Sequence, residues 1–199
     1  YGESTSLGFF LQNGGYYFTL NDKMDLSLNS DIYTKGSWAL RSQLRYRNRY
    51  KYNGNLNLSY GNMLNSEKGF PDYSVKKDFF IRWNHKQDPK SNPTINFSAN
   101  VNAGSSTFHK NNTFNNTNDY LTNTFTSGIN FSKRWEGTPF NLSTNLRHNQ
   151  NTKTNIVNLT LPDIVFNMNR IFPFKELGKS GKNHWYDKVG IRYNMNTKN

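Results

Sequence analysis

A row of arginines has the residue types and the spacing for binding anions. Between Ser37 and Tyr50, alternate positions hold Arg41, Gln43, Arg45, Arg47 and Arg49. A guanidinium group pairs with phosphate or carboxylate through two parallel hydrogen bonds. We therefore expect these residues to line a lumen and face an anionic substrate, with Arg82 and Arg147 as candidates to continue the row. A generic polar lining without a specific ligand is the alternative interpretation.

The other polar residues form no pattern typical of catalysis or metal binding. The histidines, His85, His109, His148 and His184, have no second histidine two or four positions away and no acidic cluster beside them. Metal sites need such groups of ligands, and the serines lack the sequence context of a nucleophile. We therefore predict no catalytic residue, no metal and no cofactor, and we do not expect an enzyme.

The arginine row lies on one face of a predicted β-strand. Trp38, Leu40, Leu44 and Tyr46 alternate with the polar positions, so the two faces of this strand differ in polarity. The same period of two recurs in residues 24–32, 55–60, 79–83, 94–103, 125–131, 140–146 and 189–195, although Phe80 blurs it in one of them. We predict about nine or ten strands from this pattern.

Short turns separate these strands, and they predict that neighbours in the chain pair in antiparallel fashion. Turn residues occur at 21–23, 34–36, 53–54, 88–93 and 136–139. Three longer connections are predicted at Asn62 to Lys76, Thr107 to Asp119 and Phe172 to Trp185, and we expect the first two to be mobile loops. The result is an up-and-down meander.

The composition favours a membrane barrel over a soluble fold. Only 34% of the 199 residues are hydrophobic, yet 16% are aromatic, and the mean hydropathy is −0.89. A soluble β-sandwich would have shorter strands and more Val, Ile and Leu, whereas a disordered chain would have few aromatics. No run reaches the roughly 18 apolar residues of a membrane helix. The predicted class is all-β, a segment of a large outer-membrane β-barrel.

The net charge of +12 calls for an anionic partner, which could be nucleic acid, phospholipid or an anionic glycolipid. A protein that binds single-stranded nucleic acid places aromatic side chains beside its basic ones. In the arginine strand most aromatics lie on the opposite face, so we predict no nucleic-acid partner. A lipid-transporting barrel, a porin or receptor barrel with a cationic lumen, and a soluble basic β-protein remain open at this point.

Several runs, taken in order, resemble the LptD family of lipopolysaccharide-assembly proteins. They are residues 14–22, 24–28, 36–40, 45–46, 83–85, 161–163 and 172–174. The resemblance implies that residues 1–199 are a single segment of a very large barrel in the outer membrane, with its first strands near residues 15–60. Because residues 1–6 lack the features of a signal peptide, we expect an interior segment or a mature fragment.

The resemblance also implies a function and partners. Lipopolysaccharide would arrive over an LptA-like periplasmic bridge, pass a lumen that holds an LptE-like lipoprotein plug, and leave sideways among the membrane lipids through a gate between the first and last strands. The gate strands would contain Gly15, Tyr16, Tyr17, Phe18 and Ser30. Known members have prolines where Gly15 and Ser30 stand, and the cysteines of some members are absent.

Overall fold

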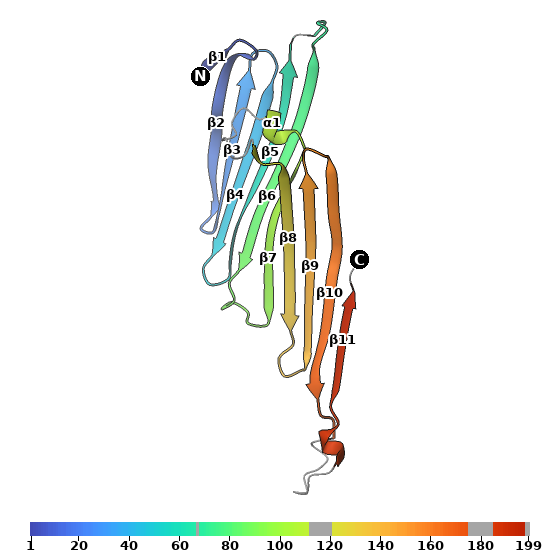
Figure 1. Ribbon diagram of the computed structural model, residues 1–199. Coiled ribbons are helices and arrows are strands. Elements are labelled where there is room, and N and C mark those ends of the chain that lie inside the picture. Colours follow the sequence, from blue (N-terminus) through green and yellow to red (C-terminus); the bar gives the residue numbers. More distant parts are fainter. Residues whose placement is uncertain (67, 112–120, 175–184, 198–199) are drawn as a thin grey trace.

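The computed structural model of the protein describes residues 1–66, 68–111, 121–174 and 185–197 as one curved antiparallel sheet (Figure 1). Its 11 strands lie in the sheet in the same order as in the chain. They are β1 (Gly2–Ser4), β2 (Gly8–Asn21), β3 (Met24–Tyr33), β4 (Trp38–Asn48), β5 (Tyr52–Asn65), β6 (Ser74–Gln87), β7 (Ile95–Gly104), β8 (Thr124–Arg134), β9 (Phe140–Asn151), β10 (Ile156–Ile171) and β11 (Ile191–Thr197). The predicted all-β meander is confirmed.

Short helices lie in the described parts of the connections between strands. The α-helix α1 (Phe108–Asn111) lies between β7 and β8, and the 3-10 helix η1 (Trp185–Lys188) precedes β11. Neither these helices nor any other helix of the described residues is long and apolar enough to span a membrane.

The strand pattern missed β1 and β10. β10 pairs in regular register with β9 at both of its ends, but the register shifts between Thr160 and Asp163, where Pro162 lies. A proline lacks the N–H needed for the ladder and is accommodated at such a bulge. The extra residue at the bulge also shifts the alternation by one position. Even-numbered residues after the bulge therefore point to the opposite side from those before it, and the period of two is broken in the middle of this strand.

The predicted turn at Asn53 and Gly54 is wrong. The chain reverses earlier, at residues 49–51, where Tyr50 has a φ of 60° and the Lys51 N–H donates to the Asn48 carbonyl at 3.1 Å. Gly54 instead lies inside β5, opposite Tyr46, and a Cβ atom there would be 2.3 Å from the Tyr46 hydroxyl oxygen. The glycine is needed because the tyrosine ring covers it.

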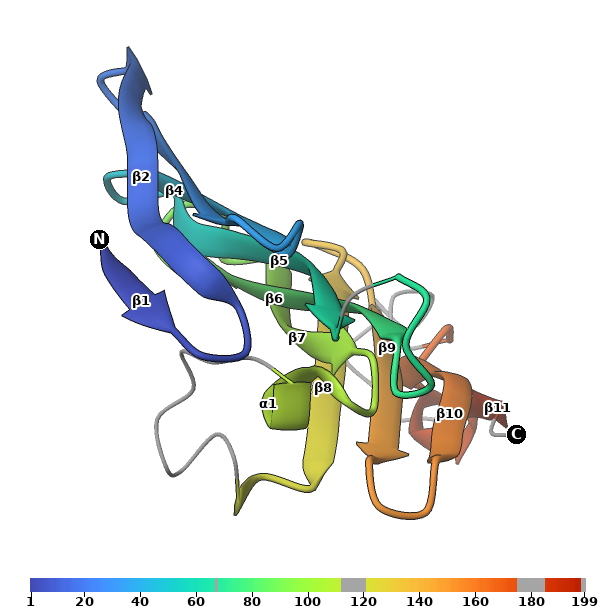
Figure 2. The same cartoon turned by 90° about the horizontal axis from the view of Figure 1, so that it is seen from above.

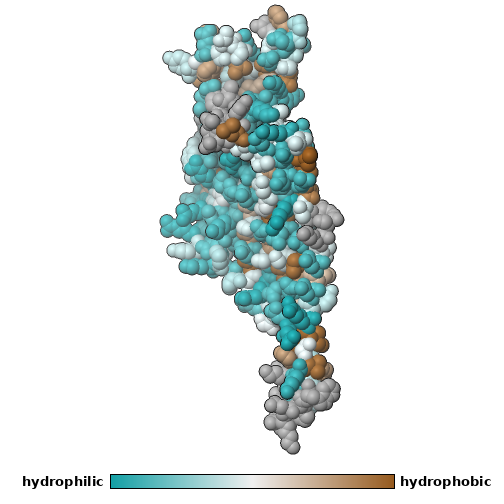
Figure 3. Space-filling view, in the orientation of Figure 1, coloured by the Kyte–Doolittle hydropathy of each residue, from teal (hydrophilic) through white to brown (hydrophobic). Residues whose placement is uncertain are grey.

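The sheet has one polar and one apolar face. Directly paired residues point to the same side, and one such row across β3 to β7 is Leu26, Leu44, Leu56, Trp83 and Val101. The adjacent row is Ser27, Gln43, Asn57, Arg82 and Asn102. The sheet curves, with α1 on its concave side (Figure 2). The concave side is the polar face, and it is largely hydrophilic in Figure 3.

Aromatic side chains gather on the apolar face at two levels. Near one end of the strands the Trp38 and Tyr60 rings lie 5.5 Å apart. Near the other end Trp83 Nε1 donates to the Tyr46 hydroxyl at 2.9 Å, and that hydroxyl hydrogen-bonds His85 Nδ1 at 2.8 Å. Two aromatic girdles flanking an aliphatic band are typical of strands that cross a bilayer.

Candidate substrate-facing surface

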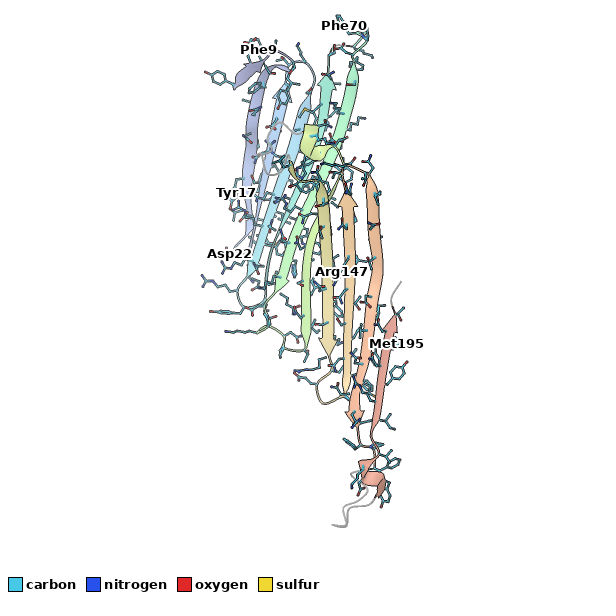
Figure 4. All side chains as sticks on the ribbon, viewed as in Figure 1. Phe9, Tyr17, Asp22, Phe70, Arg147 and Met195 are labelled. Carbon is cyan, nitrogen blue, oxygen red and sulfur yellow. The ribbon has the colours of Figure 1, made fainter. Side chains whose placement is uncertain are left out.

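A large open cavity of 2280 Å³ follows the polar face. Four of the predicted lumen residues line it, namely Gln43, Arg45, Arg47 and Arg49, and so do the candidates Arg82 and Arg147. Tyr17 on β2 and Arg147 on β9 lie on strands far apart in the sheet and both line this cavity (Figure 4). We call this surface the polar trough. Chain order and short turns bring its residues together, because each strand is added next to the one before it.

Arg41 lies on the same polar face of β4 as Gln43 and Arg45, but it does not line the cavity. Its guanidinium forms an ion pair with Asp31, in which Nη2 donates to Oδ1 at 2.7 Å. Nη2 also donates to the side-chain oxygen of Asn13 at 2.8 Å. Arg41 therefore fixes the upper parts of β2, β3 and β4 to one another.

The remaining arginines of the row have no ion pair among the described residues, although Asp25 lies directly opposite Arg45 and also lines the trough. Arg45, Arg47 and Arg49 are exposed, and the Arg41–Asp31 pair is the only ion pair among the described residues. Arg45 Nη2 donates to the side-chain oxygen of Gln43 at 3.1 Å, which orients its guanidinium. Arg49 lies in the turn after β4, so it stands at the rim of the trough. Chemically this edge can pair with phosphate or carboxylate groups.

Beyond the arginine row, amide side chains cover the polar face. Lining residues of this kind include Asn53, Asn55, Asn84, Asn100 and Asn130. Arg82 Nε donates to the Asn102 side-chain oxygen at 3.2 Å, and its guanidinium carbon lies 5.4 Å from the centre of the Phe80 ring. A surface of amides and guanidinium groups offers hydrogen-bond donors and acceptors to water and to sugar hydroxyls.

The sequence did not predict that part of a connection folds into the trough. The Phe108 ring of α1 stacks on Phe80 at 4.9 Å between ring centres, and the Phe125 ring lies 5.1 Å from Phe80. Asn111 Nδ2 donates to the buried Asp78 carboxylate at 2.7 Å. The described part of the connection predicted at Thr107 to Asp119 is thus an anchored helical turn. The sequence signal for this helical turn was Phe80, an aromatic residue at a position of β6 that faces the polar side.

The predicted gate residues lie at the start of the sheet. Tyr16 and Phe18 pair with Leu28 and Leu26 and share the apolar face, whereas Tyr17 lines the polar trough. β1 pairs only with residues 8–10 of β2. From residue 11 to residue 21, the outer edge of β2 has no strand neighbour in the part of the chain that the structure describes.

Gly15 and Ser30 stand in an intact ladder. Gly15 pairs with Asn29, and a Cβ atom at this glycine would lie 2.0 Å from the Leu28 carbonyl oxygen. Ser30 pairs with Gly14, and its hydroxyl donates to the Gly14 carbonyl oxygen at 3.1 Å. The two strands are therefore in closer contact here than a side chain at residue 15 would allow.

The histidines take structural positions where they are described. No group of three or more His, Cys, Asp or Glu side chains in the described residues could hold a metal ion. His85 belongs to an aromatic girdle, His109 packs against Phe108, and His148 Nδ1 hydrogen-bonds the Ser127 hydroxyl at 3.3 Å. His184 lies outside the described residues.

Comparison with known proteins agrees with the arrangement of the sheet. A search of curated protein sequences found no match. A family model described as LptD protein matches residues 1–199, which is the whole of the sequence. Since this match covers the complete chain, the protein belongs to the LptD family, an outer-membrane family of lipopolysaccharide transport and assembly.

Proposed function

We propose that this chain forms part of the wall of an outer-membrane barrel that passes lipopolysaccharide into the outer leaflet. The observation that carries the proposal is the row of exposed arginines Arg45, Arg47 and Arg49 along the polar trough, none of which has an ion pair among the described residues. An arginine on the lipid side of a barrel costs about 2–4 kcal/mol at the midplane and about 0–1 kcal/mol near the interfaces, whereas the opposite face of this sheet carries the aliphatic row and the aromatic girdles that suit lipid. The trough therefore faces the lumen, and the girdled apolar face meets lipid.

In this arrangement the polar face contacts the phosphates and sugars of lipopolysaccharide, and the apolar face contacts its acyl chains. The arginines pair with its phosphate groups, and the amides of the trough replace the water around its sugars. An LptE-like lipoprotein would occupy the lumen beside this wall, and an LptA-like bridge would deliver the substrate. No catalytic residue takes part, because transport needs contacts that form and break without a chemical step.

The proposed exit is a seam along β2. Its outer edge has no described neighbour from residue 11 to residue 21, so its backbone groups are available to another strand of the same barrel. Tyr16 and Phe18 on the apolar face would then contact acyl chains as they leave. The β2–β3 ladder itself is held by the close contact at Gly15, so we place the opening at the outer edge of β2.

Photo-crosslinking in cells tests this function in the complete protein. A photoreactive residue is placed at Gln43, which lines the trough, or at Leu44, its neighbour on the apolar face. We expect a lipopolysaccharide adduct from position 43 and none from position 44. An adduct from position 44 alone would contradict the assignment of the faces. Absence of an adduct at both positions in an assembled barrel would favour a solute channel.

A further inference from the structure

A second cavity lies on the other side of the sheet. It has a volume of 600 Å³ and lies between the turn that joins β4 to β5 and the turn that joins β6 to β7. Its lining residues are Arg49, Tyr50, Lys51, Tyr52, His85, Gln87 and Ser91. We call it the rim pocket. The proposed transport path does not use it.

The rim pocket opens on the apolar face. Tyr52 pairs with Gln87, and both share the side of the sheet occupied by Leu56 and Trp83. The Tyr52 and His85 rings stack with their centres 5.9 Å apart and form the floor. Because Tyr46, Trp83 and His85 belong to the girdle at this end of the strands, the pocket lies where aromatic side chains meet lipid headgroups.

Hydrogen bonds between the two turns fix the shape of the pocket. The Asp88 N–H donates to the Lys51 carbonyl at 2.8 Å, which ties one turn to the other. The Ser91 N–H and hydroxyl both donate to the Asp88 carbonyl, at 3.0 and 2.8 Å. Ser91 and Gln87 are therefore presented to the pocket by a turn that is already ordered.

The charge of the rim pocket is positive. Arg49 and Lys51 are exposed, the lining contains no acidic residue, and neither cation has an ion pair among the described residues. Asp88 follows the lining residue Gln87 in the chain but does not line the pocket, and its Oδ1 accepts the Lys90 N–H at 2.9 Å. A pocket with two cations and an aromatic floor is suited to a phosphate group.

We propose that the rim pocket binds the phosphate of a membrane lipid. A lipid held there by Arg49 and Lys51 can lay its acyl chains along the apolar face, over Leu56 and Trp83, where a free phosphate ion would gain nothing. Bound lipid would tie the β4–β5 and β6–β7 turns to the membrane surface. The rim pocket is a separate cavity from the polar trough, although Arg49, His85 and Gln87 line both, whereas Tyr50, Lys51, Tyr52 and Ser91 line the rim pocket alone.

Lipid titration of the complete protein in detergent, followed by native mass spectrometry, tests the proposal. The probes are dimyristoyl phosphatidylglycerol, dimyristoyl glycerol, which has the same chains without phosphate, and inorganic phosphate. We expect saturable binding of the phospholipid and not of the diacylglycerol. Equal binding of both lipids, or complete displacement of the phospholipid by millimolar inorganic phosphate, would overturn the assignment to a lipid phosphate.

Matched lysine variants locate the site. Lys51→Gln removes a charge from the rim pocket, and Lys86→Gln removes the same charge from the polar trough at the same end of the sheet. We expect Lys51→Gln to weaken phospholipid binding about fivefold, and Arg49→Gln with Lys51→Gln to weaken it about 25-fold, while Lys86→Gln has no effect. An equal loss in Lys86→Gln would indicate a general effect of net charge and would overturn the proposal. So would unchanged binding by the double variant in a correctly folded barrel.

Discussion

Asp31 and Arg41 form an ion pair between the neighbouring strands β3 and β4, and the Asp31 side chain is completely buried. The pair also holds β2, because Asp31 Oδ1 accepts the backbone N–H of Asn13 at 2.7 Å. Asn13 has a φ of 56° and lies where the β2–β3 register shifts. One buried carboxylate thus supports a bulge at the edge of the sheet.

Replacement of Arg41 is expected to destabilise the barrel strongly. In Arg41→Met the buried Asp31 carboxylate loses its cationic partner, and breaking such a pair costs about 3–5 kcal/mol. The measurement is urea unfolding of the complete protein in lipid vesicles, followed by tryptophan fluorescence. Arg45→Met, an exposed arginine of the same strand, is the control and should change the unfolding free energy little. Equal losses in both variants would contradict the structural role of the pair.

Gly15→Ala is expected to lower stability by about 1–3 kcal/mol, because the added methyl group meets the Leu28 backbone and the strands must separate. Gly14→Ala is the matched control, since the nearest atom to a Cβ there is a Leu11 methyl carbon at 3.6 Å. The temperature at which the folded barrel loses its altered migration in gel electrophoresis reports the difference. If both variants unfolded at the wild-type temperature, the close contact at Gly15 would be refuted.

Gly54→Ala is expected to displace the Tyr46 ring and to break its hydrogen bonds to Trp83 and His85. An aromatic ring lying over a strand glycine is a device that fixes register in sheets. We expect a lower unfolding temperature and a changed tryptophan emission spectrum. Gly61→Ala in the same strand has nothing within 4 Å of the added Cβ and should behave as wild type. A Gly54→Ala protein with unchanged emission would argue against this packing.

Ser127→Ala tests an unusual link between β7 and β8. The Ser127 hydroxyl accepts the Asn102 N–H and donates to the Asn102 carbonyl, each at 2.9 Å, in place of backbone partners. Removing it leaves two backbone groups unsatisfied, at about 1–3 kcal/mol each. Hydrogen exchange at the Asn102 amide should become faster, whereas the exposed Ser132→Ala should leave it unchanged. Equal exchange in wild type and Ser127→Ala would exclude the link.

The regular strands and the trough could be predicted because each depends on residues close in the chain. The period of two correctly placed Gln43, Arg45 and Arg47 on one face. The pattern could not predict that the charge of Arg41 is neutralised by an ion pair. Its partner Asp31 belongs to a different strand and faces Arg41 only at the observed register. A pattern of polarity does not distinguish a neutralised cation from a free one.

The remaining differences have similar causes. Phe80 interrupts the alternation of β6 because it packs under α1, which comes from a connection more than twenty residues further along the chain. Asn53 and Gly54 have the composition of a hairpin turn, but Gly54 is required by the ring of Tyr46. The rim pocket was missed because its two turns are separated by β5 and β6, and only the folded sheet brings them together.

The identity of strand order and chain order has a consequence for how such walls can change in size. Each described strand pairs only with the strands before and after it in the chain. Insertion or loss of one complete hairpin therefore leaves the direction of every other strand unaltered, and no polar face is turned toward lipid. Two added strands widen the wall by about 9–10 Å. Duplication of hairpins is thus a direct route by which a protein of this architecture can enlarge its perimeter during evolution.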